Sequence, residues 1–354
     1  MRVVSIVGAR PQFVKLGPIV GAVREADVEH LIIHTGQHYD VNMSDNFFRD
    51  LQIPAPDVHL GVGSGSHGVQ TGRILAELDD VLDQLRPDVV LAYGDTNSTL
   101  AAAISSVKLN IPVAHLEAGL RSFNRKMPEE HNRVLTDHAA DLCLAPTVLA
   151  MRNLEKEGLA SRSVLTGDVM TDVCLATLES VRAPGFQPAE LPPDGQFILS
   201  TLHRPANTDD PARLLSIVRA LAGLPQEVVL TAHPRLRAKA KEANIDLSVP
   251  GITLIDPLDY PQLVEAVDRA AFVVTDSGGL QKEAFLIRTP CVTVRTETEW
   301  IETVDLGWNV LCEDPSLIES ALAQLKPDDT ALKPYGEGRA AVAAVEAMRI
   351  RYEL

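Results

Sequence analysis

The sequence predicts an α/β protein made of two doubly wound parallel sheets, each with a domain of its own. Short, branched apolar runs alternate with longer amphipathic segments from one end of the chain to the other. This alternation is typical of strands that helices cover on both faces. Pro and Gly cluster between residues 181 and 195, and a second series of the same kind then begins. The length of 354 residues agrees, because one domain takes roughly 150 residues.

The first series contains five expected strands and one clear amphipathic helix. The strands are expected at residues 3–7, 31–34, 89–92, 113–116 and 142–145. The helix is expected at residues 69–85, where Ile74, Leu78 and Leu82 fall on one face. The second series has expected strands at residues 197–200, 228–230, 252–255, 272–275 and 291–294, and an Ala-rich helix over residues 338–348 ends the chain. Ligands of such sheets bind beyond the carboxyl ends of the strands, so we expect a cleft there, with the two sheets facing one another.

Composition and charge exclude several classes of protein. The chain is 45% hydrophobic and 23% charged, which excludes wholesale disorder. Its net charge of -16 repels polyanions, so we expect neither nucleic acid nor an anionic membrane as a partner. A local Arg/His pocket can still bind a small anion. No window approaches the roughly 18 apolar residues of a membrane span, and the start is too short for a signal-peptide core, so we expect a cytoplasmic protein.

Two patterns that resemble cofactor sites are not expected to be such sites. Cys143, Cys174, Cys291 and Cys312 are widely spaced, so we expect reduced, buried thiols rather than a zinc site or a redox pair. Residues 63–68 fit G-x-G-x-x-G, but residues 57–60 make a poor strand and no acidic residue ends a strand about 20 positions later. We therefore expect a Gly/Ser-rich loop there and no dinucleotide site.

Cations follow the first expected strand. Arg10 and Lys15 lie on the first turns of a helix, whose amino terminus already favours anions. This arrangement predicts a phosphate-facing site, although surface charge at a helix start is an equally good interpretation of this segment alone.

A second anion site is predicted in the other half of the chain. Ser277, Gly278 and Gly279 follow a strand and open a helix, so their backbone N–H groups are unobstructed and can hold a diphosphate. Glu283, further along the same helix, can accept hydrogen bonds from ribose hydroxyls. The alternative is a simple tight turn.

Acidic residues follow two neighbouring strands and open a third segment. Asp95 and Glu117 lie at strand ends, and Glu129 and Glu130 open a helix beside a Pro. Carboxylates that converge on one cleft can supply both an acid and a base. For Glu129 and Glu130 the alternative is a favourable contact with the helix dipole.

Histidines follow two strands of the second half. His203 and Arg204 come after the first of these strands, where a His can donate to phosphate or protonate a departing oxygen. His233 repeats the arrangement one unit later with a weaker claim.

Taken together, these segments resemble one known family, the non-hydrolysing UDP-N-acetylglucosamine 2-epimerases. The motifs that carry the resemblance run from about residue 3 to residue 310: GARPQFVK, TGQHYD, GDTNST, HLEAGLRS, MPEEHNR, TGD at residues 166–168, LHRPAN and DSGGLQKEA. The resemblance implies a GT-B-like fold of two Rossmann-like domains at residues 1–170 and 171–335, with the terminal segment 336–354 packed back on the first. It also implies a homodimer in cell-surface polysaccharide biosynthesis.

The family reaction implies a chemistry that needs no metal and no cofactor. Carbon 2 of the sugar has no carbonyl beside it, so its proton is removable only after the C1–O bond breaks and UDP leaves. A 2-acetamidoglucal then forms beside UDP, and re-addition with the proton on the other face inverts carbon 2. Such a path needs phosphate stabilisers and carboxylates.

The resemblance assigns a role to each matching residue. The diphosphate would be held by Arg10, His203, Ser277, Gly278 and Gly279, and the ribose by Glu283. Lys15, Asp95, Glu117 and Glu129 would serve the sugar, with Asp95 and Glu117 as the essential pair and Glu129 orienting the sugar or sharing acid/base duty. Which carboxylate removes the proton stays open.

The chain departs from the best-known members at three places. Trp300 stands where they have a cation, Tyr39 and Asp40 follow Gln37 and His38, and Pro205 and Ala206 follow His203 and Arg204. These variants resemble the branch with epimerases of UDP-2,3-diacetamido-2,3-dideoxyglucuronic acid, which is the alternative substrate. Other classes that remain are a GT-B glycosyltransferase, a hydrolysing epimerase and a nucleotide-sugar sensor.

Overall fold

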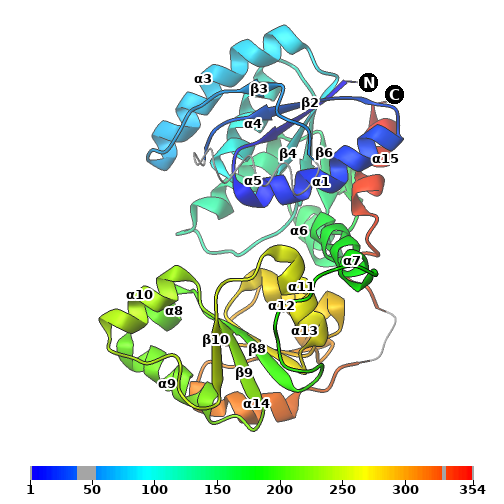
Figure 1. Ribbon diagram of the computed structural model, residues 1–354. Helices are drawn as coiled ribbons and strands as arrows, with labels where there is room; N and C mark the ends of the chain where they lie inside the picture. The colour runs from blue at the N-terminus through cyan, green and yellow to red at the C-terminus, as the bar shows by residue number, and fades with distance from the viewer. Residues whose placement is uncertain (1, 38–52, 329–331, 353–354) are drawn as a thin grey trace. The chain divides into compact units, whose positions relative to one another are not determined.

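The computed structural model describes residues 2–37, 53–328 and 332–352 (Figure 1). The chain divides into two compact units. Unit 1 comprises Met1–Val173 and Lys333–Leu354, and unit 2 comprises Cys174–Leu332. Each unit contains one parallel sheet with helices on both faces, which confirms the predicted α/β class with two doubly wound sheets.

The sheet of unit 1 has the strand order β3-β2-β1-β4-β5-β6-β7, and all of its pairs are parallel. The order reverses between β1 and β4, so the chain leaves these two neighbours in opposite directions along the sheet. The elements are β1 (Arg2–Val7), α1 (Arg10–Glu25), β2 (Glu29–His34), β3 (Val58–His59), α3 (His67–Leu85), β4 (Val89–Tyr93), α4 (Asn97–Lys108), β5 (Val113–Leu116), α5 (Pro128–Ala139), β6 (Leu142–Ala145), α6 (Val148–Lys156), a 3-10 turn (Ala160–Arg162), β7 (Ser163–Leu165), α7 (Val169–Arg182) and α15 (Ala340–Arg351).

Alternating residues of the strands fill the two cores of unit 1. On β1, Val3 and Val7 face a core that α1 and α15 cover, whereas Val4 and Ile6 face a core covered by α3 and α4. The terminal helix α15 lies beside α1 and inserts Met348, among other residues, into the first core (Figure 1). The central strand β4 lies between these two cores and is buried at every position.

Unit 2 repeats the plan with the strand order β10-β9-β8-β11-β12-β13, again wholly parallel, and the reversal lies between β8 and β11. The elements are β8 (Phe197–Thr201), α8 (Pro205–Thr208), α9 (Pro211–Ala222), β9 (Glu227–Thr231), α10 (Pro234–Glu242), β10 (Ile252–Ile255), α11 (Tyr260–Arg269), β11 (Phe272–Thr275), α12 (Gly278–Ile287), β12 (Cys291–Thr293), α13 (Ile301–Asp305), β13 (Asn309–Leu311), a 3-10 turn (Pro315–Leu317) and α14 (Ile318–Gln324). Helices α9, α10 and α14 cover one face, and α11 and α12 cover the other.

The structure adds three strands that the sequence pattern did not predict. These strands, β3, β7 and β13, have two or three residues each and form edges of the two sheets. Residues 57–60, which make a poor strand by sequence, contain the two-residue strand β3 (Val58–His59), and this strand pairs with β2. The Gly/Ser-rich segment that follows is irregular until α3 begins at His67, as predicted.

The boundary between the units falls inside a helix rather than in the Pro/Gly stretch. Helix α7 begins in unit 1, where Val169 joins the core, and continues into unit 2, where Leu178 and Val181 are core residues. Because unit 2 begins at Cys174, the Pro/Gly stretch at residues 183–195 lies wholly within unit 2. The four cysteines are free and buried, as predicted. Among the described helices, none is long and apolar enough to cross a membrane.

Candidate active site

In unit 1, the predicted site residues follow the strands on either side of the reversal point. After β1, the N–H groups of Gly8 and Ala9 donate to Gln12 Oε1 at 2.8 and 3.0 Å, and Gln12 Nε2 donates to the Tyr93 carbonyl at 2.9 Å. Gln12 therefore ties the end of β1 to the end of β4. Helix α1 starts at Arg10, which is exposed, and continues to Lys15, whose side chain is only 13% exposed.

Lys15 forms an ion pair with Glu117, the carboxylate that follows β5. Burial by itself lowers the pKa of the Lys15 ammonium, but the carboxylates of Glu117, Asp95 and Asp168 outweigh burial and raise this pKa above its ordinary value. The ammonium is thus charged at neutral pH and lies among three carboxylates. Such a cation can stabilise negative charge on a leaving group or on a sugar oxygen.

The backbone around this ion pair adopts unusual conformations. Glu117 has a φ of 70°, in the left-handed region that side chains other than glycine rarely adopt. Gly94, directly before Asp95, has a φ of 62°, and a Cβ there would lie 3.3 Å from Glu117 Oε2 and 3.4 Å from Lys15 Nζ. Glycine at this position lets the turn after β4 approach the ion pair closely.

Asp95 is held from helix α5. Arg133 Nη2 lies 2.6 Å from Asp95 Oδ2, and Asn132 Nδ2 donates to the Asp95 carbonyl at 2.9 Å. Arg133 also pairs with Glu130 at 3.0 Å, and the carboxylates outweigh burial in raising the pKa of its guanidinium. Asp95 and Glu117 therefore each hold a cation instead of facing one another as a bare carboxylate pair.

The two glutamates that open α5 have different surroundings. Glu130 is buried and accepts hydrogen bonds from Ser122 N, Ser122 Oγ and Phe123 N at 2.8 to 3.0 Å. Burial raises the pKa of Glu130, but these hydrogen bonds and Arg133 bring it below the ordinary value, so Glu130 fixes a loop. Glu129 is half-buried, and among the described residues no hydrogen bond or ion pair to its carboxylate is found. Of the two, Glu129 is the one available to a substrate.

In unit 2, a buried aspartate organises the segment after β8. Asp276 follows β11, is fully buried, and accepts from His203 N and Arg204 N at 3.0 Å and from Asn207 Nδ2 at 3.1 Å. Its carboxylate also lies 3.1 Å from His203 Nδ1. Burial raises the pKa of Asp276, whereas His203 and these donors bring it below the ordinary value. The contact orients the half-exposed imidazole and leaves Nε2 for a ligand.

A pocket of about 250 Å³ lies in unit 2 at the carboxyl ends of its strands. Its wall is apolar at Leu202, Pro257, Leu258 and Leu263. Leu280 adds to this apolar wall, and the polar side is formed by Thr201, His203, Thr231, His233, Ser277, Gly279 and Glu283. An apolar wall beside a few convergent polar groups is typical of a site for a small molecule.

The amino terminus of α12 lies at this pocket. Ser277 is its N-cap and accepts from Leu280 N at 3.2 Å. A Cβ on Gly278 would lie 2.5 Å from Glu299 Oε1, whereas a Cβ on Gly279 would meet nothing closer than Ser277 Oγ at 3.9 Å. Gly279 thus leaves the N–H groups of this first turn accessible from the pocket, as an anion requires.

Glu283 lines the pocket from one turn further along α12 and is only 8% exposed. Burial raises the pKa of its carboxyl, and the Tyr260 hydroxyl and the Lys282 ammonium offset this increase only in part. His233, which the sequence ranked below His203, also lines the pocket and caps α10 by accepting from Arg235 N at 3.3 Å. Trp300 packs under Lys282, whose Nζ lies 4.0 Å from the ring centroid, so a cation remains near the position where the chain departs from its relatives.

The predicted residues therefore form two groups. Unit 1 brings together Lys15, Asp95 and Glu117, with Glu129 on α5, while Arg10 opens α1. Unit 2 brings His203, Ser277, Gly279 and Glu283 to one pocket, and Gly278 lies next to it.

Sequence reasoning missed Arg133, Asp276 and the apolar pocket wall, although Arg133 stands within the quoted MPEEHNR segment and Asp276 directly before Ser277. His38, Tyr39 and Asp40 lie outside the described residues. Within the described part of the chain, no group of three or more His, Cys, Asp or Glu side chains is placed to hold a metal.

Comparison with known proteins identifies the class and then the family. A family model described as UDP-N-acetylglucosamine 2-epimerase matches residues 22–349. The chain is 46% identical to the UDP-2,3-diacetamido-2,3-dideoxy-D-glucuronate 2-epimerase of Pseudomonas aeruginosa, over 96% of this chain and 97% of that one. It is 39% identical to the UDP-N-acetylglucosamine 2-epimerase of Methanocaldococcus jannaschii, over 96% of each chain.

Solved structures agree. The crystal structure of the Methanocaldococcus jannaschii UDP-GlcNAc 2-epimerase in complex with UDP-GlcNAc and UDP matches with a TM-score of 0.83 and 36% identity, covering 99% of this chain and 100% of that one. The UDP-GlcNAc 2-epimerase of Neisseria meningitidis bound to UDP-GlcNAc matches with a TM-score of 0.83 and 27% identity, covering 98% and 99%. The fold is that of the GT-B-like UDP-GlcNAc 2-epimerases, which are isomerases that act on nucleotide sugars. The chain belongs to the UDP-N-acetylglucosamine 2-epimerase family.

Proposed function

We propose that the chain interconverts UDP-N-acetylglucosamine and UDP-N-acetylmannosamine by elimination and re-addition of UDP. The observation that carries the proposal is the buried Lys15–Glu117 ion pair at the strand reversal of unit 1, with Asp95 beside it. A carboxylate pair next to a fixed cation can remove a proton from carbon 2 and return it. The family match along nearly the whole chain supports the same reaction.

The first half of the reaction breaks two bonds. The C1–O bond breaks with its electron pair on the UDP phosphate oxygen, and positive character develops at carbon 1. Arg10, His203 and the N–H groups at the start of α12 stabilise the departing diphosphate. One carboxylate of Asp95 and Glu117 then takes the carbon 2 proton, and the electrons of that C–H bond form the double bond of 2-acetamidoglucal.

The second half adds UDP and a proton back across the double bond. The UDP oxygen attacks carbon 1 on the face from which it left. The double-bond electrons take a proton from another carboxyl group among Asp95, Glu117 and Glu129, on the face of carbon 2 opposite to the one that lost its proton. That carboxyl group regains a proton from solvent, and the first carboxylate releases to solvent the proton that it took. Lys15 keeps the Glu117 carboxylate in place and offsets its charge, and Glu129 orients the sugar or shares the proton transfer. Glu283 accepts hydrogen bonds from the ribose.

The first alternative to this proposal is the same reaction on a different UDP sugar. The relative from Pseudomonas aeruginosa that acts on UDP-2,3-diacetamido-2,3-dideoxy-D-glucuronate is 46% identical, compared with 39% for the Methanocaldococcus jannaschii UDP-N-acetylglucosamine 2-epimerase. Both substrates carry a 2-acetamido group and UDP, so the same residues serve either one. As part of the proposal, we expect a cytoplasmic homodimer that supplies cell-surface polysaccharide synthesis, and sedimentation analysis tests the dimer.

Proton NMR of the purified protein with UDP-N-acetylglucosamine in deuterated water tests the function. We expect UDP-N-acetylmannosamine with deuterium at carbon 2, without added NAD or metal. Equal amounts of free UDP and free sugar would instead identify a hydrolysing epimerase. No change with this substrate, together with turnover of the diacetamido uronic acid, would transfer the assignment to the second substrate.

A further inference from the structure

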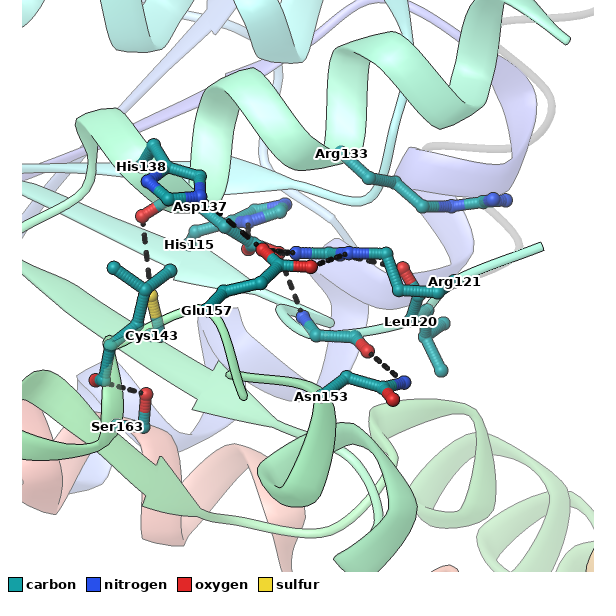
Figure 2. A network of polar contacts seen from close by, with 12 residues as sticks. His115, Leu120, Arg121, Arg133, Asp137, His138, Cys143, Asn153, Glu157 and Ser163 are labelled. Atoms are coloured by element: carbon teal, nitrogen blue, oxygen red, sulfur yellow. Dashed lines mark hydrogen bonds and ion pairs between the residues drawn. The ribbon is translucent and has the colours of Figure 1, made fainter. Parts of the chain in front are cut away.

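A buried polar network lies behind the unit 1 site and includes residues that the proposed reaction does not use (Figure 2). At its centre is Asp137, on the last turn of α5, with a fully buried carboxylate. Asp137 Oδ1 lies 2.6 Å from His115 Nδ1, and Oδ2 accepts from Gly119 N at 3.0 Å. Arg121 Nη2 lies 2.7 Å from the same Oδ2. Figure 2 shows the side chains of His115 and Arg121 beside the Asp137 carboxylate.

The two oxygens of Asp137 hold the chain on both sides of Glu117. His115 lies two residues before Glu117, and Gly119 lies two residues after it. Glu117 itself has the left-handed φ of 70°, which costs free energy and persists only where the surroundings impose it. Asp137 supplies that constraint by fixing both flanks of the strained residue.

The same network reaches the residue before Asp95. His115 Nε2 lies 2.7 Å from the Gly94 carbonyl, which can only accept a hydrogen bond, so Nε2 carries a proton. Burial raises the pKa of Asp137, but His115 and Arg121 lower it below the ordinary value. His115 thus bridges the Gly94 carbonyl through Nε2 and the Asp137 carboxylate through Nδ1.

We propose that Asp137 is a positioning residue for the acid/base pair, because it fixes Glu117 through the residues on both of its flanks and Asp95 through His115 and the Gly94 carbonyl. This inference rests on the proposed function of Asp95 and Glu117. It also explains why His115, Gly119 and Arg121 lie around Glu117 in a single segment. All three contact the Asp137 carboxylate, which helix α5 supplies. Asp137 touches neither substrate nor the reacting atoms in this role.

The structure provides a matched control in the outer part of the network. Glu157 receives Arg121 Nε at 2.8 Å and Nη2 at 2.7 Å, but its carboxylate is 26% exposed and bonds neither flank of Glu117. Glu157→Gln therefore weakens the same guanidinium pairing and leaves His115, Gly119 and Gly94 in place. It separates loss of stability from loss of alignment.

The test compares Asp137→Ala, Asp137→Asn and Glu157→Gln with the unchanged chain by NMR in deuterated water. We expect Asp137→Ala to lower kcat about 100-fold, since a displacement of roughly 1 Å costs that much. UDP affinity, measured by calorimetry, is expected to change less than about twofold, because the UDP pocket lies in unit 2. Asp137→Asn keeps one acceptor and recovers part of kcat, and Glu157→Gln turns over like the unchanged chain.

One readout does not depend on how much protein is folded. A misaligned acid/base pair returns the proton less efficiently, so more 2-acetamidoglucal and UDP escape for each epimerised product. We expect Asp137→Ala to raise this ratio, whereas a smaller folded fraction leaves it unchanged. If Asp137→Ala does not fold, His115→Leu replaces it: Asp137 keeps Arg121 and Gly119, whereas the contacts of His115 with Asp137 and with the Gly94 carbonyl are both lost.

The outcomes separate the two proposals. Normal kcat and a normal ratio in folded Asp137→Ala or His115→Leu overturn the positioning role while the proposed function stands. An equal loss in Glu157→Gln overturns it too, because that result assigns the effect to stability. If the unchanged chain exchanges no deuterium at carbon 2 of either UDP sugar, the proposed function fails and the positioning role falls with it.

Discussion

Unit 1 and unit 2 share a strand order but carry different chemistry where that order reverses. In unit 1, Asp95 and Glu117 lie in the loops after β4 and β5 and Lys15 lies on α1, and each carboxylate has a cation within contact distance. In unit 2 the corresponding loops form a small pocket with an apolar wall, Ser277 and Gly279 at a helix start, and one buried carboxyl, Glu283. The same architecture thus carries a cluster of ion pairs in one unit and a small pocket with an apolar wall in the other, and we propose proton transfer at the first and nucleotide binding at the second. The comparison predicts that changes in unit 1 alter rate and that changes in unit 2 alter affinity.

The largest effect is expected from removing a carboxylate in unit 1. Asp95→Asn and Glu117→Gln are each expected to lower kcat by about 10² to 10⁴-fold, the range of general acid–base catalysis. UDP affinity is expected to stay within about twofold, as calorimetry would show. Asp83→Asn is the matched control, because Asp83 is an exposed partner of Arg86 at the end of α3. Near-normal turnover in Asp95→Asn would remove Asp95 from the essential pair.

A smaller effect, on UDP affinity rather than on kcat, is expected in unit 2. Glu283→Gln is expected to weaken UDP binding by about 10 to 100-fold, since hydrogen bonds to a charged group contribute about 1.5–3 kcal/mol. The kcat at saturating substrate is expected to change little. Glu319→Gln, on the exposed start of α14, is the control. A loss of kcat without a loss of affinity in Glu283→Gln would contradict the division between the two units.

The pH dependence of UDP binding sharpens the same comparison. Burial raises the pKa of Glu283 above its ordinary value of 4.5. As the pH falls, the carboxyl therefore begins to take up its proton while the pH is still above 4.5. A protonated carboxyl accepts ribose hydrogen bonds poorly, and UDP affinity is therefore expected to decline by up to about tenfold per pH unit below this pKa. The terminal phosphate of UDP, with a pKa of about 6, titrates in the same region. Calorimetry of Glu283→Gln isolates the Glu283 contribution, and an identical profile in both proteins would exclude it.

The smallest effects are expected from helix caps, one in each unit. Thr147 caps α6 in unit 1 by accepting from Ala150 N at 3.1 Å, and Asp259 caps α11 in unit 2 by accepting from Gln262 N at 2.9 Å. Replacing either residue with Ala is expected to lower the free energy of unfolding by about 1 kcal/mol. If the units unfold separately, calorimetric melting shows two transitions, and each variant shifts only one of them by about 2–4 °C. A common shift of a single transition would show that the units unfold together.

Long-range pairings limit what the sequence predicts about the strands. The buried inner strands are continuous apolar runs, and β5 and β6 begin and end where their residues predict. The edge strands β3, β7 and β13 have few residues and mixed polarity, so no periodicity marks them. They exist because a neighbouring strand offers its free edge, as β2 does to Val58–His59. The unit boundary inside α7 has a similar cause, since successive turns of one helix join two different cores.

The sequence by itself determined the two-sheet plan and the family. It also placed Asp95, Glu117 and His203 directly after strands, and Lys15 and Glu283 on helices that follow strands. These features are local, because apolar runs define strands and the residues after each run must lie at the carboxyl edge of a parallel sheet. Only the tertiary structure decided that Arg133 holds Asp95, that Asp276 orients His203, and that Asp137 joins both flanks of Glu117. Each of these contacts links separate elements, and no spacing in the chain encodes which buried charge meets which partner. That choice is made when the elements pack, because a buried charge is stable only beside a group that compensates it.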